Sequence, residues 1–116
     1  MKKLLSIVVL TIMFVVAAVQ PPAFAADIAH GKQIFQGNCN ACHLGGRNTI
    51  MSMKTLKEDA LEKYLKGYKE DHVAAVTYQV TNGKGAMPAF KGRLKSNEIE
   101  DVVAYVVDQA ENNSWK

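Results

Sequence analysis

Two cysteines and a histidine stand together in the run Cys39-Asn40-Ala41-Cys42-His43, and the 116-residue chain has no other cysteine. Cys-x-x-Cys-His is the spacing at which haem is attached covalently to a polypeptide. Both thiols can add to the vinyl groups of one porphyrin, and the adjacent histidine is then held beneath the iron as its proximal ligand. The motif therefore predicts one covalently bound haem, attached through Cys39 and Cys42, with His43 as an iron ligand.

Three other interpretations of the motif are open. Cys-x-x-Cys can form a thiol-disulfide redox pair, but such pairs usually begin a helix in a strand-helix-strand unit, and this sequence shows no strand-helix alternation. A structural zinc site needs four Cys or His ligands, and the sequence has no second Cys/His cluster to supply them. The third interpretation is a small structural disulfide beside a core histidine. The haem interpretation is favoured over all three.

The side chain on the other face of the iron decides between an electron carrier and an enzyme with an open site. Met87 is the best candidate. It lies in Gly83-Lys84-Gly85-Ala86-Met87-Pro88, where glycines let the backbone fold closely over a flat cofactor and Pro88 favours an extended conformation at Met87. A thioether is a soft donor found opposite histidine in cytochromes.

Other side chains could compete with Met87 for this position. Met51 and Met53 lie in the loop that follows the haem motif, and a buried methionine more often fills a gap in the core. His30 is close to the attachment site along the chain, which makes it hard for this side chain to cross the ring. His72 is expected in the first turn of a helix, as a solvated surface residue.

The elements that must position these residues are four predicted helices, with no convincing strand alternation. The expected helices are residues 27–38, 58–65, 71–81 and 96–110, capped where visible by Asp27 and Ser96. Their apolar stripes are expected to bury Ile28, Gly31, Ile34 and Phe35; Leu61, Tyr64 and Leu65; Val73, Val76 and Val80; and Ile99, Val102, Val103, Val106 and Ala110. The charge-dense stretch 57–71 has the composition of a solvated surface. The fold class is all-α.

The N-terminus has the composition of a secretory signal. Lys2 and Lys3 precede an apolar run from Leu4 to Val19, and Ala23-Phe24-Ala25 is a small-x-small cleavage site. A retained membrane anchor is the alternative, although Gln20-Pro21-Pro22 interrupts a run shorter than the ~20 apolar residues of a span. We expect residues 1–25 to be removed and residues 26–116 to form one exported domain.

Charge gives little information about partners. Removing Lys2 and Lys3 with the signal would lower the formal charge from +3 to +1. Two haem propionates would bring it to about −1, a value near zero that gives no sign of a nucleic-acid partner.

The mature sequence resembles the cytochrome c6 family, small class I c-type cytochromes of photosynthesis. The residues that carry the resemblance are Ala26-Asp27, Gly31, Phe35, Asn38 to His43, Gly45-Gly46, Lys54-Thr55-Leu56, Thr77-Tyr78-Gln79-Val80, Asn82-Gly83-Lys84-Gly85-Ala86-Met87-Pro88-Ala89-Phe90, Gly92-Arg93-Leu94 and Ala104-Tyr105-Val106. The run from Asn82 to Phe90 is far more specific than the haem motif alone.

The resemblance implies the class I cytochrome c fold, with about four helices around one haem and Gly31 of the first helix crossing the last helix at Tyr105 or a neighbour. It also implies a soluble carrier, not an enzyme, that moves electrons in the thylakoid lumen from cytochrome f of the cytochrome b6f complex to photosystem I. In cyanobacteria a terminal oxidase is a further acceptor. The mature protein would not be embedded in the membrane, and its origin is cyanobacterial or plastid.

Two further features come from the family pattern. Gln79 matches a glutamine that lies near the haem in members of positive potential; an ordinary helix-surface amide is the alternative. Met51-Ser52-Met53 departs from the pattern, because relatives often have Pro-Asp at positions 52 and 53. A proximal histidine is oriented by the acceptor of its second ring nitrogen. The missing proline leaves open how firmly this loop supports His43.

A candidate docking surface lies beside the Met87 loop. Lys91, Arg93 and Lys95 follow it directly, and we expect Arg93, backed by the two lysines, to meet an acidic partner surface. Ordinary solubilising charges are the alternative. The alternative for the whole protein is a haem enzyme or sensor with an open iron site.

Overall fold

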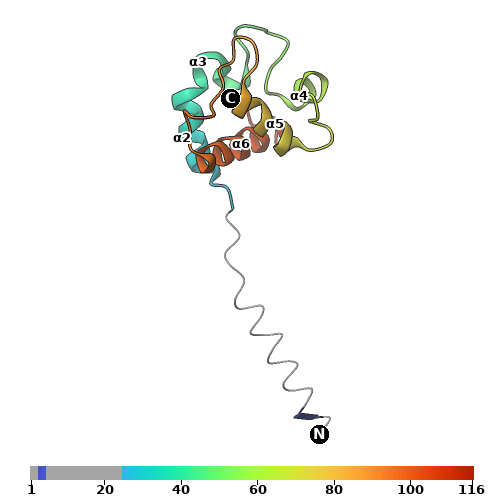
Figure 1. Ribbon diagram of the computed structural model, residues 1–116. Helices are drawn as coiled ribbons and strands as arrows, with labels where there is room; N and C mark the ends of the chain where they lie inside the picture. Colours follow the sequence, from blue (N-terminus) through green and yellow to red (C-terminus); the bar gives the residue numbers. More distant parts are fainter. Residues whose placement is uncertain (1–2, 5–24) are drawn as a thin grey trace.

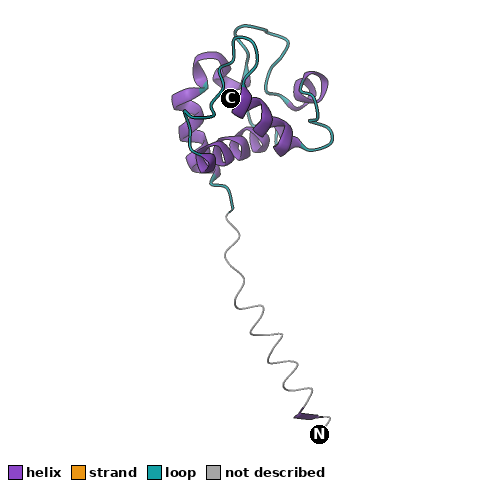
Figure 2. Cartoon of the chain, in the orientation of Figure 1, coloured by secondary structure: helices purple, strands orange, loops and turns teal. Residues whose placement is uncertain are grey.

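Residues 25–116 form a helical domain built on a crossing of α2 (Ile28–Asn38) and α6 (Ser96–Glu111). The computed structural model describes residues 3–4 and 25–116, so residues 1–2 and 5–24 of the predicted signal lie outside the described residues. In chain order the elements are α2 (Ile28–Asn38), α3 (Asn40–His43), the 3-10 turn η1 (Leu44–Gly46), α4 (Glu58–Tyr64), α5 (His72–Asn82) and α6 (Ser96–Glu111). In the described residues every regular element is a helix, as Figure 2 shows.

Gly31 sets the distance between α2 and α6. A Cβ on this residue would overlap the backbone carbonyl of Asp101 and lie 3.0 Å from the Cβ of Tyr105. Only glycine therefore lets the two helices approach so closely at this point. The expected contact between Gly31 and Tyr105 is confirmed, and α5 packs on another part of α6 (Figure 1).

The core follows most of the stripes that the sequence predicts, although Tyr64 and Leu65 are only half-buried and two other positions are exposed. Every predicted core position of α6 is buried, and Val102 and Val103 are almost completely enclosed. Ile28 and Val73, however, are 42% and 54% exposed. Ile28 is the first residue of α2 and Val73 is the second of α5, and both side chains remain exposed, so their expected burial was wrong.

Helix starts depend on side-chain acceptors near the first free amides. Asp27 accepts a hydrogen bond from the His30 N–H at 3.0 Å, as its predicted capping role requires. Ser96 is not a cap, because α6 already begins there. Instead, Glu98 reaches back and accepts from the Lys95 backbone N–H at 2.7 Å. This bond supplies the acidic partner near the positive end of α6.

The charge-dense stretch 57–71 contains a fully buried tyrosine. Tyr68 has no exposed surface, and its hydroxyl donates to a carboxylate oxygen of Glu58 at 2.8 Å. Its ring stacks on His72, with centroids 4.1 Å apart. The charged stretch is therefore not only a solvated surface. Its Tyr68 side chain points inward and packs against His72 of α5.

Candidate functional site

The haem motif occupies one tight helical turn. α2 ends at Asn38, and the amides of Cys42 and His43 both donate to the carbonyl of Cys39, at 3.2 and 2.9 Å. Cys39 and His43 therefore lie one turn apart along α3. Both cysteines are free, half-buried thiols, and Cys39 packs against the hydrophobic core.

The state of the thiols disfavours the other interpretations of the motif. Burial raises the pKa of the Cys39 thiol to about 11. A thiol-disulfide exchange centre needs the opposite, a lowered pKa that supplies thiolate. In residues 3–4 and 25–116, no three His, Cys, Asp or Glu side chains are grouped in a way that could hold a metal ion, so a zinc site of protein ligands has no support.

His43 is oriented by a backbone carbonyl. Its Nδ1 lies 2.8 Å from the carbonyl oxygen of Arg47. Because a carbonyl only accepts, Nδ1 carries the proton and donates it, and the lone pair remains on Nε2. This is the tautomer that an axial iron ligand needs, with the orienting hydrogen bond on the other nitrogen.

The loop around Ser52 and Met53 is held by the side chain of Asn48. The Oδ1 of Asn48 accepts from the amides of Ile50 and Met51, at 3.1 and 2.8 Å, and its Nδ2 donates to the carbonyl of Lys54 at 2.9 Å. The loop is further tied to the haem motif, since the Thr49 amide donates to the Cys42 carbonyl at 3.1 Å. Asn48 thus closes the loop across Ser52 and Met53.

Met87 lies on a turn that glycine makes possible. Gly83 has φ +65°, and a Cβ there would come within 2.6 Å of the backbone of residues 87–89. Lys84 and Met87 exchange two backbone hydrogen bonds of 3.0 Å. The Met87 side chain is half-buried and packs against the core, and its sulfur accepts a hydrogen bond from Gln79 Nε2 at 3.8 Å. Gln79 is therefore placed beside the candidate ligand and is not a free surface amide.

The competing side chains are engaged or exposed elsewhere. Met51 and Met53 are 50% and 71% exposed on the other loop. His30 pairs with Asp101 at 2.7 Å. His72 is half-buried and pairs with Glu111 at 2.6 Å, so the expectation of a merely solvated histidine was wrong. Its tertiary partner on α6 could not be recognised from the local sequence.

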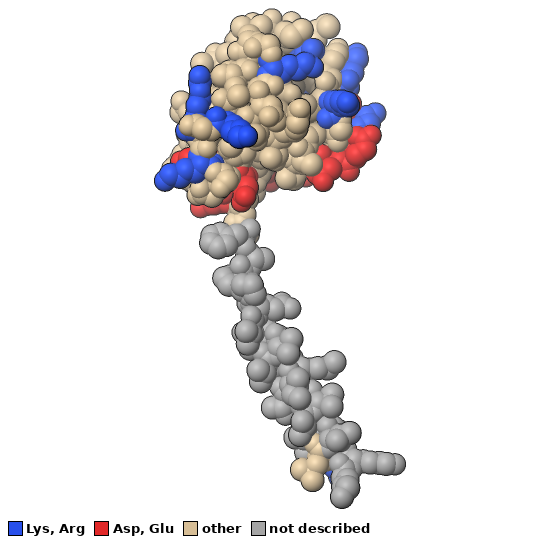
Figure 3. All heavy atoms as spheres, viewed as in Figure 1, with Lys and Arg blue, Asp and Glu red and all other residues tan. Residues whose placement is uncertain are grey.

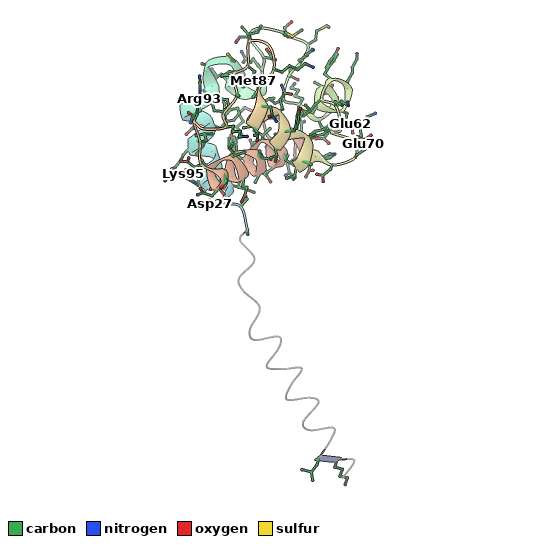
Figure 4. All side chains as sticks on the ribbon, viewed as in Figure 1. Asp27, Glu62, Glu70, Met87, Arg93 and Lys95 are labelled. Carbon is green, nitrogen blue, oxygen red and sulfur yellow. The ribbon has the colours of Figure 1, made fainter. Side chains whose placement is uncertain are left out.

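Arg93 lies on the exposed rim of the same loop. Gly92 has φ +83°, and the Arg93 amide donates to the Phe90 carbonyl at 2.9 Å, so the chain turns sharply and presents its cations outward. The ion pairs found within the described ranges all involve histidine, which leaves Arg93 without one there. In Figure 4 Arg93 and Lys95 lie at the opposite side of the view from Glu62 and Glu70.

Two contributors to the site were not recognised from the sequence. One is the carbonyl of Arg47, which no residue pattern could reveal. The other is Trp115, whose indole N–H donates to the carbonyl of Leu56 at 2.8 Å and whose ring lies against Gly46. Trp115 is the only tryptophan of the sequence, and Gly45-Gly46 is its only pair of adjacent glycines. No local sequence pattern, however, indicates that the two contact each other.

These residues fit a c-type haem. Two free thiols lie on one turn with a histidine whose Nε2 is available, and a soft thioether comes from a separate loop. Such a donor set suits iron in a porphyrin and not a hard cation.

Comparison with known proteins gives the family. The family model described as "Cytochrome C oxidase, cbb3-type, subunit III" matches residues 26–106. A cytochrome c6 of a Picosynechococcus species is 58% identical over 99% of this chain and 100% of its own length. The cytochrome c6 of Limnospira maxima is 64% identical over 73% of this chain and 96% of its own length. The chain belongs to the cytochrome c6 family.

A solved structure extends the agreement to the fold. Cytochrome c6 of the diatom Phaeodactylum tricornutum superposes with a TM-score of 0.71, at 51% identity, over 74% of this chain and 97% of that one. The predicted all-α class I cytochrome c fold is confirmed. As a member of the cytochrome c6 family, the protein carries a covalently bound c-type haem and is an electron-transfer protein, not an enzyme.

Among the described residues, none of the helices has the length and apolar character that a membrane span requires.

Proposed function

We propose that this member of the cytochrome c6 family carries single electrons from cytochrome f of the cytochrome b6f complex to photosystem I, through a haem attached at Cys39 and Cys42 and ligated by His43 and Met87. A haem iron with both axial positions filled by protein exchanges electrons and has no vacant position for oxygen or peroxide. The observation that carries the proposal is that both candidate ligands are held by hydrogen bonds. The Arg47 carbonyl oxygen lies 2.8 Å from His43 Nδ1, and Gln79 Nε2 lies 3.8 Å from the Met87 sulfur.

Optical spectroscopy of the oxidised holoprotein tests the ligation. We expect the weak near-infrared sulfur-to-iron band, its loss in Met87→Ala, and its retention in Met53→Ala. Met53 is a matched control because it is the exposed methionine of the competing loop. Loss of the band only in Met53→Ala would identify Met53, and not Met87, as the ligand. Absence of the band in the wild type would favour an open or bis-nitrogen iron site.

Arg93 is the proposed docking cation for the acidic surface of the partner. It is exposed, lies six residues after Met87 and has no ion pair in the described part of the chain. Figure 3 shows lysines and arginines over several parts of the visible face, with acidic atoms gathered toward its lower edge. Exposed charges beside the electron-transfer route act mainly on the association rate and are screened by salt.

The docking test is a charge reversal at two places. Arg93→Glu should lower the rate constant for reaction with photosystem I at low salt, and the difference should shrink as salt is added. Lys69→Glu is the control, because Lys69 is next to Glu70 on the other side of the molecule (Figure 4). Equal effects of the two variants would mean that only net charge matters.

We also propose that the chain is exported to the thylakoid lumen and that residues 1–25 are removed there. The proposed mature domain begins at Ala26, and the next residue is already tied to it, since the Asp27 amide donates to Asp101 at 2.7 Å. Intact-mass measurement of protein isolated from the lumen should give a chain that begins at Ala26; a mass that includes residues 1–25 would contradict this.

A further inference from the structure

The C-terminal residues fold back onto the glycine pair that follows the haem motif. After α6 the backbone reverses at Asn113, whose φ of +49° is unusual for a residue other than glycine, and the Ser114 amide donates to the Gln109 carbonyl at 2.9 Å. Trp115 is thereby laid on the crossing of α2 and α6. Its ring centroid lies 5.3 Å from that of Phe35 and 5.9 Å from that of Tyr105.

Trp115 also contacts the loop on the histidine side. Its indole Nε1 donates to the Leu56 carbonyl at 2.8 Å, across 59 residues of sequence. A Cβ on Gly46 would lie 2.5 Å from the indole ring, and a Cβ on Gly45 would lie 2.8 Å from the Lys116 carbonyl oxygen. The C-terminal residues therefore hold both ends of loop 44–57, at the glycine pair and at Leu56.

A short series of hydrogen bonds connects this contact to His43. The Leu56 amide donates to the Gly46 carbonyl at 2.7 Å, so the two ends of the loop are joined to each other as well as to Trp115. Gly46 immediately precedes Arg47, whose carbonyl accepts the Nδ1 proton of His43 at 2.8 Å. Trp115 is thus connected, through Leu56 and Gly46, to the residue whose carbonyl orients His43.

We propose that Trp115 is a positioning residue for His43: by clamping loop 44–57 onto the crossing of α2 and α6, it holds the Arg47 carbonyl that orients the imidazole. This rests on the proposed role of His43 as an axial ligand. A firm Nδ1–H donor bond keeps the proton on that nitrogen and makes Nε2 the better ligand.

Proton exchange at the His43 ring measures this positioning directly. In nuclear magnetic resonance of the reduced holoprotein, the His43 Nδ1 proton exchanges with solvent only when its bond to Arg47 opens. The amides of Val102 and Val103, which lie in the fully enclosed core of α6, report opening of the whole domain instead. The ratio of the two rates separates a local loss of positioning from a general loss of stability.

The test variant is Trp115→Phe, which retains an aromatic ring over Gly46 and removes the N–H that donates to Leu56. We expect the ring proton of His43 to exchange roughly fivefold faster relative to the two valine amides, the factor that the loss of one ordinary hydrogen bond gives. Tyr68→Phe is the matched control. It also removes one donor, to the Glu58 carboxylate, which takes no part in the hydrogen bonds between Trp115 and His43, and should leave the ratio unchanged.

Each result has one meaning. A ratio that rises in Trp115→Phe alone supports the positioning role. A ratio that stays at the wild-type value, or that rises equally in Tyr68→Phe, overturns it. The axial role is judged separately: a His43 ring without the haem-induced shift in the wild-type spectrum would refute the proposed ligation, whatever the exchange rates.

Discussion

His30 on α2 and Asp101 on α6 form an ion pair, with 2.7 Å between imidazole Nδ1 and a carboxylate oxygen. The second oxygen of Asp101 accepts the backbone N–H of Asp27, also at 2.7 Å. One carboxylate thus joins the start of the domain to its last helix, beside the contact of Gly31 with the Asp101 backbone. The hydrogen bond to Asp101 raises the pKa of His30, and the bond to His30 lowers that of Asp101.

The first prediction concerns the pH dependence of this pair. His30 stabilises the folded state fully below its ordinary pKa of 6.5, and this contribution is lost as the pH rises through the raised folded-state pKa. Asp101 contributes above its ordinary pKa of 3.8, and this is lost as the pH falls through its lowered value. The free energy of unfolding of wild type minus that of His30→Gln should be largest between these two values.

Urea unfolding at a series of pH values measures this difference, with Trp115 fluorescence as the signal. The His72 pair is present in both proteins and cancels in the subtraction. A difference that grows above pH 6.5 would contradict the assignment.

The second prediction uses two glycines of α2. Gly31→Ala should lower the free energy of unfolding by about 2 kcal/mol, because its Cβ would overlap the Asp101 carbonyl and force the helices apart. Gly37→Ala is the matched control, since a Cβ there meets nothing within 4 Å. Alanine is the better helix former, so this variant should gain up to about 1 kcal/mol. Chemical unfolding of both holoproteins would detect the opposite signs.

The third prediction concerns the reduction potential. The Gln79 amide donates to the Met87 sulfur at 3.8 Å and draws electron density from it, which favours reduced iron if Met87 is the ligand. A hydrogen bond of about 1 kcal/mol corresponds to about 40 mV for one electron, so Gln79→Leu should lower the midpoint potential by roughly that amount. Redox titration should show no comparable fall in Thr77→Val, on the same helix; an unchanged potential in Gln79→Leu would count against the contact.

The fourth prediction concerns the buried tyrosine of the charged stretch. Tyr68→Phe keeps the ring that stacks on His72 and removes only the hydroxyl that donates to Glu58. The free energy of unfolding should fall by about 1 kcal/mol, the usual value of one hydrogen bond. Tyr64→Phe is the comparison, because Tyr64 is the last residue of α4, is only half-buried and should change the free energy far less. Equal losses of unfolding free energy in the two variants would mean that the Tyr68 hydroxyl does not form a stabilising hydrogen bond with Glu58.

The fifth prediction concerns His72. Its hydrogen bond to Glu111 is the main cause of its raised pKa, with smaller contributions from Glu58 and Glu62. In a titration followed by nuclear magnetic resonance, Glu111→Gln should return the His72 pKa toward 6.5, whereas Glu62→Gln should move it much less. A larger shift of the His72 pKa in Glu62→Gln than in Glu111→Gln would mean that His72 interacts mainly with α4 and not with α6.

The chemistry of the site could be predicted from the sequence because it depends on local spacing. Thioether attachment needs two thiols and a histidine within one helical turn, and the structure places Cys39 and His43 on that turn. The glycines around Met87 are equally local, since Gly83 makes its turn through its own left-handed φ. The core of α6 follows from a periodicity that every one of its turns repeats. These features are determined by neighbours a few residues apart.

The tertiary structure alone decided how those groups are held. Asp101 meets the Asp27 amide across 74 residues, and Trp115 meets Leu56 across 59. Such contacts depend on where the helices cross, which no local pattern contains. The acceptor that orients His43 is a backbone carbonyl, a group that every residue possesses. The sequence by itself therefore determined which side chains are candidates to bind haem, and only the fold decided which peptide group orients the histidine.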